Sequence, residues 1–201
     1  MTLLARRDEL GEFLVRMGLT IRGAELGVYR GEFAETILSR WPGRLLLVDP
    51  WRYLPDYLDS WNADDCAAEK NLAETCTRLA SFTDRIDILR RKSADAANLV
   101  ADQSLDFVYI DANHSYESTS MDLKLWYPKV RAGGLVSGHD YFDALADDDL
   151  EPDLRSWNKV FAPDVLTSYG VKSAVDQFAR DHGYHVSQTD EDFPTWYFVK
   201  Q

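Results

Sequence analysis

Short apolar segments alternate with longer segments of helical periodicity along most of this chain. Two of the apolar segments, 45–48 and 105–110, are almost continuously apolar, which is typical of strands covered on both faces of a sheet. Across the chain we expect strands at 21–28, 45–48, 85–89, 105–110 and 135–137, and helices at 3–17, 32–41, 64–79, 94–99 and 116–129. Because strands that alternate with helices form parallel sheets, the pattern predicts an α/β, Rossmann-like, doubly wound and mostly parallel sheet.

The C-terminal part of the chain departs from this alternation. A helical segment at 171–182 is followed by two short β-rich segments, 185–187 and 195–200, with an acidic turn at 190–192 between them. Two such segments around a turn predict an antiparallel hairpin.

One domain accounts for the whole length. The sequence has no internal repeat and no linker composition, so residues 1–201 are expected to fold as a single unit. We interpret residues 1–20 as an N-terminal helix. Residues 141–168 have weak periodicity and many acidic side chains, and we interpret them as an insertion on the substrate side.

The charge balance limits the partners of the chain. Its 201 residues carry a formal net charge of −12, and Arg90, Arg91 and Lys92 form the main basic cluster. Nucleic acids and anionic membrane surfaces are bound through basic patches, so we expect neither as a partner. A neutral or cationic small-molecule substrate fits the charge better, and the oligomeric state stays open, a homodimer included.

Two further features indicate the compartment. No apolar run approaches the roughly 20 residues of a membrane span, and the N-terminal residues lack the apolar stretch of a secretory signal. The two cysteines, Cys66 and Cys76, have the spacing neither of a zinc site nor of a disulfide framework. We therefore expect a cytoplasmic protein with both thiols reduced.

Small or ionisable residues stand where the predicted strands end. They are Gly27, Asp49, Ser93, Asp111 and the pair His139 and Asp140. In a doubly wound sheet, ligands bind outside the carboxyl ends of the strands. The sequence therefore predicts a ligand site made of these residues.

The first predicted strand ends in a glycine loop, 25–31, which reads ELGVYRG. Gly27 and Gly31 allow the backbone to approach a ligand closely, but their spacing is not the G-x-G-x-x-G of dinucleotide enzymes. A plain strand-to-helix turn is the alternative interpretation. Asp49, about 20 residues further on, is placed either to bind ribose hydroxyls or to cap the turn before Pro50.

Four segments, taken in order, carry a family resemblance. They read ELGVYRG at 25–31, LVDPW at 47–51, DFVYIDANHSYE at 106–117 and GGLVSGHDY at 133–141. Together they resemble the class I S-adenosylmethionine-dependent methyltransferases. The pattern looks closest to the branch of small-molecule and sugar O-methyltransferases of the macrocin type, and the C-terminal hairpin is similar to the strand pair of that fold.

This resemblance implies S-adenosylmethionine as the cofactor and a role for each matching residue. Glu25, Gly27 and Gly31 would surround its methionine part, Asp49 would bind its ribose, and Ser93 would lie near its adenine. Asp111 would contact the cofactor and lie between it and the acceptor.

Tyr29 departs from the family, in which many members have glycine at that place, so the conformation of the loop is left open. The next residue, Arg30, has no assigned role.

Methyl transfer to a hydroxyl requires a base or a metal that helps to remove the proton. His114 and His139 are the candidate bases, because histidine titrates near neutral pH and both follow predicted strands. Asp111 and Asp140, with His139, form an alternative oxygen-rich site for Mg²⁺. Both histidines could instead only orient loops through backbone hydrogen bonds. His182 and His185 stand away from these strand ends, and we interpret them as structural.

These observations favour an S-adenosylmethionine-dependent methyltransferase that acts on a small-molecule hydroxyl. Two alternatives stay open, an NAD(P)-dependent oxidoreductase on a Rossmann-like sheet and a cofactor-binding homologue without catalysis.

Overall fold

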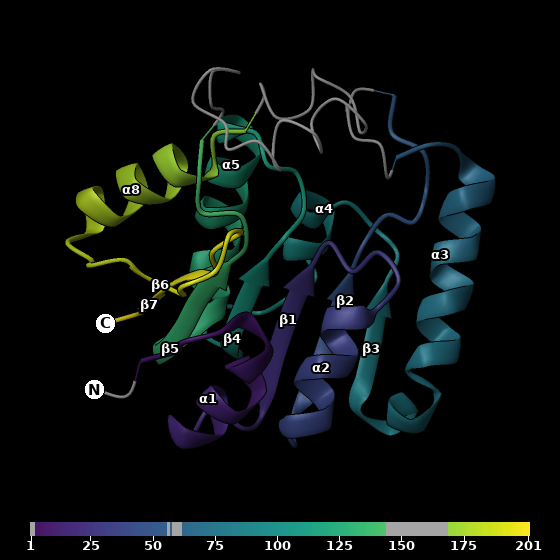
Figure 1. Ribbon diagram of the computed structural model, residues 1–201, viewed down its shortest axis with the longest axis horizontal. Coiled ribbons are helices and arrows are strands. Elements are labelled where there is room, and N and C mark those ends of the chain that lie inside the picture. Colours follow the sequence, from purple (N-terminus) through teal and green to yellow (C-terminus); the bar gives the residue numbers. More distant parts are fainter. Residues whose placement is uncertain (1–2, 56, 58–61, 144–168) are drawn as a thin grey trace.

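The computed structural model describes residues 3–55, 57, 62–143 and 169–201. Within these ranges the strands form one mixed sheet in the order β3-β2-β1-β4-β5-β7-β6 (Figure 1). Their bounds are β1 (Arg22–Leu26), β2 (Arg44–Val48), β3 (Ile86–Leu89), β4 (Leu105–Ile110), β5 (Val130–Gly138), β6 (Ser187–Gln188) and β7 (Trp196–Val199). Strands β1 to β5 pair in parallel, whereas β7 is antiparallel to both β5 and β6. The predicted doubly wound sheet with an antiparallel C-terminal hairpin is confirmed.

Helices cover both faces of this sheet (Figure 1). Helices α1 (Leu10–Arg16), α2 (Glu32–Arg40) and α3 (Asp65–Arg78) contribute to one apolar core. Helices α4 (Ser93–Ala97), α5 (Tyr116–Trp126) and α8 (Val171–His182) contribute to the other. Short 3-10 helices complete the described elements: η1 (Arg7–Glu9), η2 (Ala80–Arg85) and η3 (Tyr127–Lys129). None of the helices in the described ranges is long and apolar enough to cross a membrane.

The continuous apolar strands of the sequence are explained by these two cores. In β2, Leu45 and Leu47 enter the core beside α1 and α2, whereas Leu46 and Val48 enter the opposite core. Successive strand side chains point to opposite faces, so a strand with a helix layer on each side is apolar at every position. The carboxyl ends of β1 and β4 point to the same edge, at the top of Figure 1.

The N-terminal helix is shorter than predicted. It was expected over 3–17, within an N-terminal unit of 1–20, but α1 begins only at Leu10, after the single 3-10 turn η1. The cause is tertiary. The amide of Leu4 donates to the Tyr197 hydroxyl at 3.1 Å, and that of Arg7 donates to Glu191 Oε2 at 2.7 Å. The bond from the Arg7 amide to the C-terminal hairpin therefore replaces the intrahelical bond that this amide would have made in a helix beginning at residue 3.

Other differences are small. The fifth strand extends from Val130 to Gly138, beyond the predicted 135–137, and the first hairpin strand is Ser187–Gln188 instead of 185–187. Cys66 and Cys76 are both exposed, and neither is in a disulfide within the described residues. Of the predicted insertion, residues 144–168 lie outside the described residues.

Candidate active site

A cavity of about 860 Å³ opens at the carboxyl ends of the parallel strands. A volume of this size suits a cofactor together with a small ligand. Nearly all of the predicted site residues line it, from five different strand ends: Glu25, Gly27, Asp49, Ser93, Asp111, His114, His139 and Asp140. Gly31 is not among the lining residues, because it forms the left-handed N-cap of α2 and faces Thr75.

The glycine loop is held close to the end of β4. Gly27 has a φ of +82°, and a β-carbon built there would lie 1.8 Å from the carbonyl oxygen of Asp111. Tyr29 also has a left-handed φ, of +54°, so tyrosine adopts the conformation that glycine would adopt easily. Its carbonyl oxygen accepts hydrogen bonds from Trp51 Nε1 at 2.9 Å and from Thr75 Oγ1 at 3.1 Å. These contacts hold the strained backbone in place.

Asp49 ties this loop together. Its Oδ2 accepts the amides of Val28 and Tyr29 at 2.9 and 3.0 Å, and its Oδ1 accepts the amide of Trp51 at 2.7 Å. Burial raises the pKa of Asp49, and the three amide donors oppose that rise. The carboxylate therefore acts as a fixed acceptor for the loop backbone. Its predicted contact with ribose stays a prediction.

Glu25 is the most buried acid of the cavity, with 1% of its surface exposed. Its Oε2 has no hydrogen-bond partner among the described residues. Burial raises the pKa of Glu25 well above its ordinary value, although nearby Arg7 lowers it. A buried carboxyl with an unsatisfied oxygen is a site for a cationic donor.

Arg30 had no assigned role in the sequence. Its Nε donates to Asn71 Oδ1 at 3.0 Å, which links the glycine loop to α3.

Ser93 begins α4 and faces α5. Its hydroxyl donates to Asp122 Oδ1 at 2.5 Å, and both residues line the cavity. Burial raises the pKa of Asp122 to about 6, although the hydrogen bond from Ser93 opposes the rise.

His114 lies between two carboxylates. Its Nε2 is 3.0 Å from Asp140 Oδ2 and 3.4 Å from Asp111 Oδ1, and its ring stacks on Tyr169 with centroids 4.7 Å apart. Burial favours the neutral ring, but the two acids outweigh it and raise the pKa of His114 to about 10. In this arrangement His114 holds a proton at neutral pH, so its position favours a fixed cation over a base.

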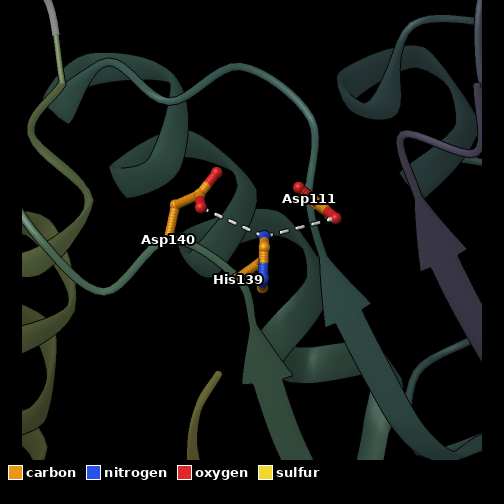
Figure 2. A group of neighbouring side chains, drawn as sticks. All are labelled: Asp111, His139 and Asp140. Atoms are coloured by element: carbon orange, nitrogen blue, oxygen red, sulfur yellow. Dashed lines mark ion pairs between the residues drawn. The ribbon is translucent and has the colours of Figure 1, made fainter. Parts of the chain in front are cut away.

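His139 makes a different contact with the same acids (Figure 2). Its Nδ1 is 3.1 Å from Asp140 Oδ1 and 3.9 Å from Asp111 Oδ2. The tautomer with its proton on Nδ1 donates to Asp140 and leaves a lone pair on Nε2. Burial would raise the pKa of Asp140, yet His114 and His139 hold it well below its ordinary value.

Residues 24–141, more than half of the chain, match the model of a family described as a methyltransferase domain. The chain belongs to this methyltransferase family. The match begins in β1 and ends just after Asp140, so it contains all five strand ends that line the cavity.

Several solved structures share this fold at low sequence identity. A candidate caffeoyl-CoA O-methyltransferase from Staphylococcus aureus is 13% identical, with a TM-score of 0.66 over 98% of this chain and 85% of that one. An O-methyltransferase family protein from Burkholderia thailandensis is 15% identical, with a TM-score of 0.64 over 97% and 59%. The N-methyltransferase NodS from Bradyrhizobium japonicum WM9 is 13% identical, with a TM-score of 0.58 over 96% and 94%. No curated protein matches the chain. At these identities the likeness concerns the fold.

One site residue of the methyltransferase that its sequence did not indicate, besides Asp122, is an arginine near the N-terminus. Arg7, from η1, enters the cavity, and its Nη2 donates to Asp111 Oδ2 at 2.6 Å. Its guanidinium lies 4.1 Å from the centre of the Phe33 ring. Burial would raise the pKa of Asp111, but Arg7 and the two histidines hold it below its ordinary value. An isolated Arg6-Arg7 pair near the N-terminus carries no motif that would have predicted this contact.

The predicted metal ligands of the methyltransferase do lie together. Single ligand atoms of Asp111, His139 and Asp140 fall within 4.8 Å of one another. However, each of the four carboxylate oxygens already has a nitrogen contact, two with His114, one with His139 and one with Arg7. Mg²⁺ prefers oxygen ligands in an open octahedral arrangement. These residues, as arranged, do not fit a resident Mg²⁺.

Proposed function

We propose that this protein transfers a methyl group from S-adenosylmethionine to a hydroxyl group of a small molecule. The observation that carries the proposal is the buried Glu25 carboxyl, with its unsatisfied Oε2, in the strand-end cavity of a methyltransferase domain. The cofactor has a cationic amino group and a cationic sulfonium, which suit a cavity lined by Glu25, Asp49 and Asp111.

The same cavity argues against a dinucleotide. In dinucleotide enzymes, the amides of the glycine loop bind the pyrophosphate. Here the amides of Val28 and Tyr29 already donate to Asp49, and that of Gly31 donates to the carbonyl oxygen of Val28 at 2.9 Å. An anionic pyrophosphate would find the donors occupied and three carboxyl groups nearby.

When bound, the cofactor supplies a methyl carbon that is activated by the positively charged sulfur. Glu25 would accept from its amino group, Gly27 lets the loop lie against the end of β4, and Asp49 keeps the loop in shape. Ser93 and Asp122 line the part of the cavity that the family resemblance assigns to adenine. These residues contribute by alignment, which is the main requirement of a direct displacement.

For the acceptor, we propose His139 as the proton acceptor. Its Nδ1 donates to Asp140, which orients the ring and leaves Nε2 to take the proton of an acceptor hydroxyl. His114, held as a cation by Asp111 and Asp140, adds positive charge near the reacting oxygen. The positive charge of Arg7 and His114 supports a hydroxyl over a cationic amine as the acceptor.

A binding experiment separates the proposed cofactor from the alternative. S-adenosylhomocysteine is expected to raise the melting temperature by several degrees, whereas NAD is expected to leave it unchanged. The reverse result would show that the oxidoreductase alternative is right. Stabilisation without methyl transfer to any acceptor would support the non-catalytic alternative instead.

Turnover tests the hydroxyl and its base. Transfer of labelled methyl from S-adenosylmethionine is measured on pairs of small molecules that differ only in a hydroxyl or an amino group. We expect transfer to the hydroxyl member, lost by about 100-fold or more in His139→Gln. The control is His182→Gln, since His182 packs on Phe178 with ring centroids 4.0 Å apart and does not line the cavity. Preference for the amine, or full activity of His139→Gln, would contradict the proposal.

A further inference from the structure

Arg7 occupies the place between Asp111 and His139 that a catalytic cation would take. Its Nη2 donates to Asp111 Oδ2 at 2.6 Å, and its Nη1 lies 3.3 Å from His139 Nε2. We propose that Arg7 is the resident cation of this reaction centre, so that the acceptor oxygen is bound and its charge is stabilised by guanidinium instead of a divalent metal. This inference rests on the proposed methyl transfer.

The carboxylates of the cluster already have basic partners. Asp111 contacts Arg7 at 2.6 Å and His114 at 3.4 Å, and Asp140 contacts His114 at 3.0 Å and His139 at 3.1 Å. A divalent ion would have to break these contacts and would add positive charge beside a partly buried guanidinium, which is costly. It would also have to displace the guanidinium of Arg7, which stays positively charged because arginine is not deprotonated in proteins.

The position of Arg7 is fixed by both its side chain and its backbone. Its guanidinium stacks over Phe33 at 4.1 Å from the ring centre. Its amide donates to Glu191 Oε2 at 2.7 Å, and the neighbouring Ala5 carbonyl accepts from the Asp190 amide at 3.3 Å. The turn of the C-terminal hairpin thus anchors the N-terminal segment that delivers the cation. Arginine in a stacked and paired position keeps a fixed direction of its N–H donors.

The contact between Arg7 Nη1 and His139 Nε2 is long, at 3.3 Å. A hydroxyl that lies beside this contact, within hydrogen-bond distance of both nitrogens, can donate its proton to Nε2 and accept a hydrogen bond from Nη1. As the oxygen bonds to the methyl carbon, the carbon–sulfur bond breaks with its electron pair on sulfur, and the proton stays on His139. Arg7 then contacts the reacting oxygen throughout, as preorganised donors do in other enzymes.

Metal binding tests this inference without a turnover assay. Mn²⁺ is titrated into the full chain, and bound Mn²⁺ is measured by electron paramagnetic resonance. The wild type and Arg6→Met are expected to bind no Mn²⁺ at about 100 μM, a concentration that would fill a site of moderate affinity. Arg7→Met leaves the Asp111 carboxylate without its partner, so this variant is expected to gain a Mn²⁺ site, and Arg7→Met/Asp111→Asn is expected to lose it again.

Arg6 is the matched control because it precedes Arg7 on the same segment but points to solvent, with 63% of its side chain exposed. Micromolar Mn²⁺ binding by the wild type would overturn the inference, and this measurement does not depend on any variant being folded. Mn²⁺ binding that is equal in the wild type and Arg7→Met would overturn it as well.

Kinetics then test the contact with the acceptor. In the wild type, activity is expected to be unchanged by a chelator. Arg7→Met is expected to lower kcat by about 100-fold or more, while the KM for the cofactor changes less than about twofold. Loss of activity with a chelator would overturn the inference. Failure of S-adenosylhomocysteine to bind would instead remove the proposed function and leave the metal-binding result standing.

Discussion

Gly27 lies so close to Asp111 that a β-carbon at Gly27 would be 1.8 Å from the carbonyl oxygen of Asp111. The loop after β1 and the end of β4 are therefore in backbone contact across the floor of the cavity. The amide of Asp111 donates to the carbonyl oxygen of Leu26 at 2.8 Å and continues this contact. The backbones of the glycine loop and of the strand end that carries Asp111 therefore hold each other in place.

This contact predicts that Gly27→Ala displaces the loop. We expect a loss of about 3 kcal/mol or more in the free energy of unfolding, because a clash with backbone adds to the strain of a positive φ. S-adenosylhomocysteine binding should be abolished. The control is Gly18→Ala, where φ is +72° and a β-carbon would meet nothing within 4 Å. It should cost only about 1 kcal/mol and leave binding intact; equal effects of the two variants would contradict the role of the contact.

We predict that Asp49 stabilises the glycine loop even when no ligand is bound. Asp49→Ala leaves the amides of Val28, Tyr29 and Trp51 without their acceptor. We expect a loss of about 2–4 kcal/mol in the free energy of unfolding in the absence of cofactor, measured by urea denaturation. Asp49→Asn keeps one acceptor oxygen and should lose less. Asp87→Ala is the control, since its carboxylate pairs with Arg44 at the surface. An unchanged stability of Asp49→Ala would mean that the carboxylate serves the ligand alone.

Glu25 predicts that cofactor binding releases a proton. Its raised pKa favours the protonated carboxyl in the empty cavity, whereas a bound cationic amino group favours the ionised form. Binding should therefore strengthen as pH rises toward this raised pKa, by at most about tenfold per pH unit. Calorimetry of S-adenosylhomocysteine binding in phosphate and in Tris should give different enthalpies.

The comparison of the two buffers tests whether Glu25 is the group that releases the proton. Glu25→Gln should abolish the difference in binding enthalpy between the buffers. Glu35→Gln, on α2 with 43% of the Glu35 side chain exposed, should keep this difference. Identical enthalpies for the wild type in both buffers would show that Glu25 does not change its protonation.

Asp122 predicts a pH dependence of stability. Burial raises its pKa in the folded state to about 6, from an ordinary value of 3.8. The folded state therefore binds the proton more tightly, and its stabilising effect is complete below about pH 4 and is lost as pH rises to about 6. A difference of about two units between the folded and unfolded pKa values corresponds to about 3 kcal/mol in the free energy of unfolding.

Asp122→Asn cannot ionise, and its amide oxygen can still accept from Ser93. Relative to the wild type, its free energy of unfolding should increase between pH 4 and pH 6 and then stay constant. Asp95→Asn, on the exposed part of α4, should follow the wild type. A constant difference between Asp122→Asn and the wild type across this pH range would contradict the prediction.

The fold and most strand-end residues could be predicted because their signals are local. Continuous apolar strands such as 45–48 report a helix layer on each face, and the residue after each strand must lie at the carboxyl edge of a parallel sheet. Gly27, Asp49, Asp111 and Asp140 were found in this way, and all of them line the cavity. The contacts of these residues could not be predicted in the same way, because a strand end is surrounded by segments that are distant in the sequence.

The hydrogen-bond and ion-pair partners of these residues come from distant parts of the chain and could not be predicted from the sequence. Arg7 reaches Asp111 over 104 positions of sequence, and a helix was predicted across the segment that delivers it. Two carboxylates lie beside His114, at 3.0 and 3.4 Å, and its place after a strand does not indicate either contact. Asp49 had a ribose as its expected partner, and the structure adds three loop amides.

By itself, the sequence determined the α/β layering, the edge of the sheet that carries the site and most of the residues on it, because strand periodicity and strand ends are properties of neighbouring residues. Only the tertiary structure decided which charges face one another. Ion pairs such as Arg7–Asp111 form when distant segments pack, and their electrostatic energy depends on distance and burial, neither of which a one-dimensional pattern records.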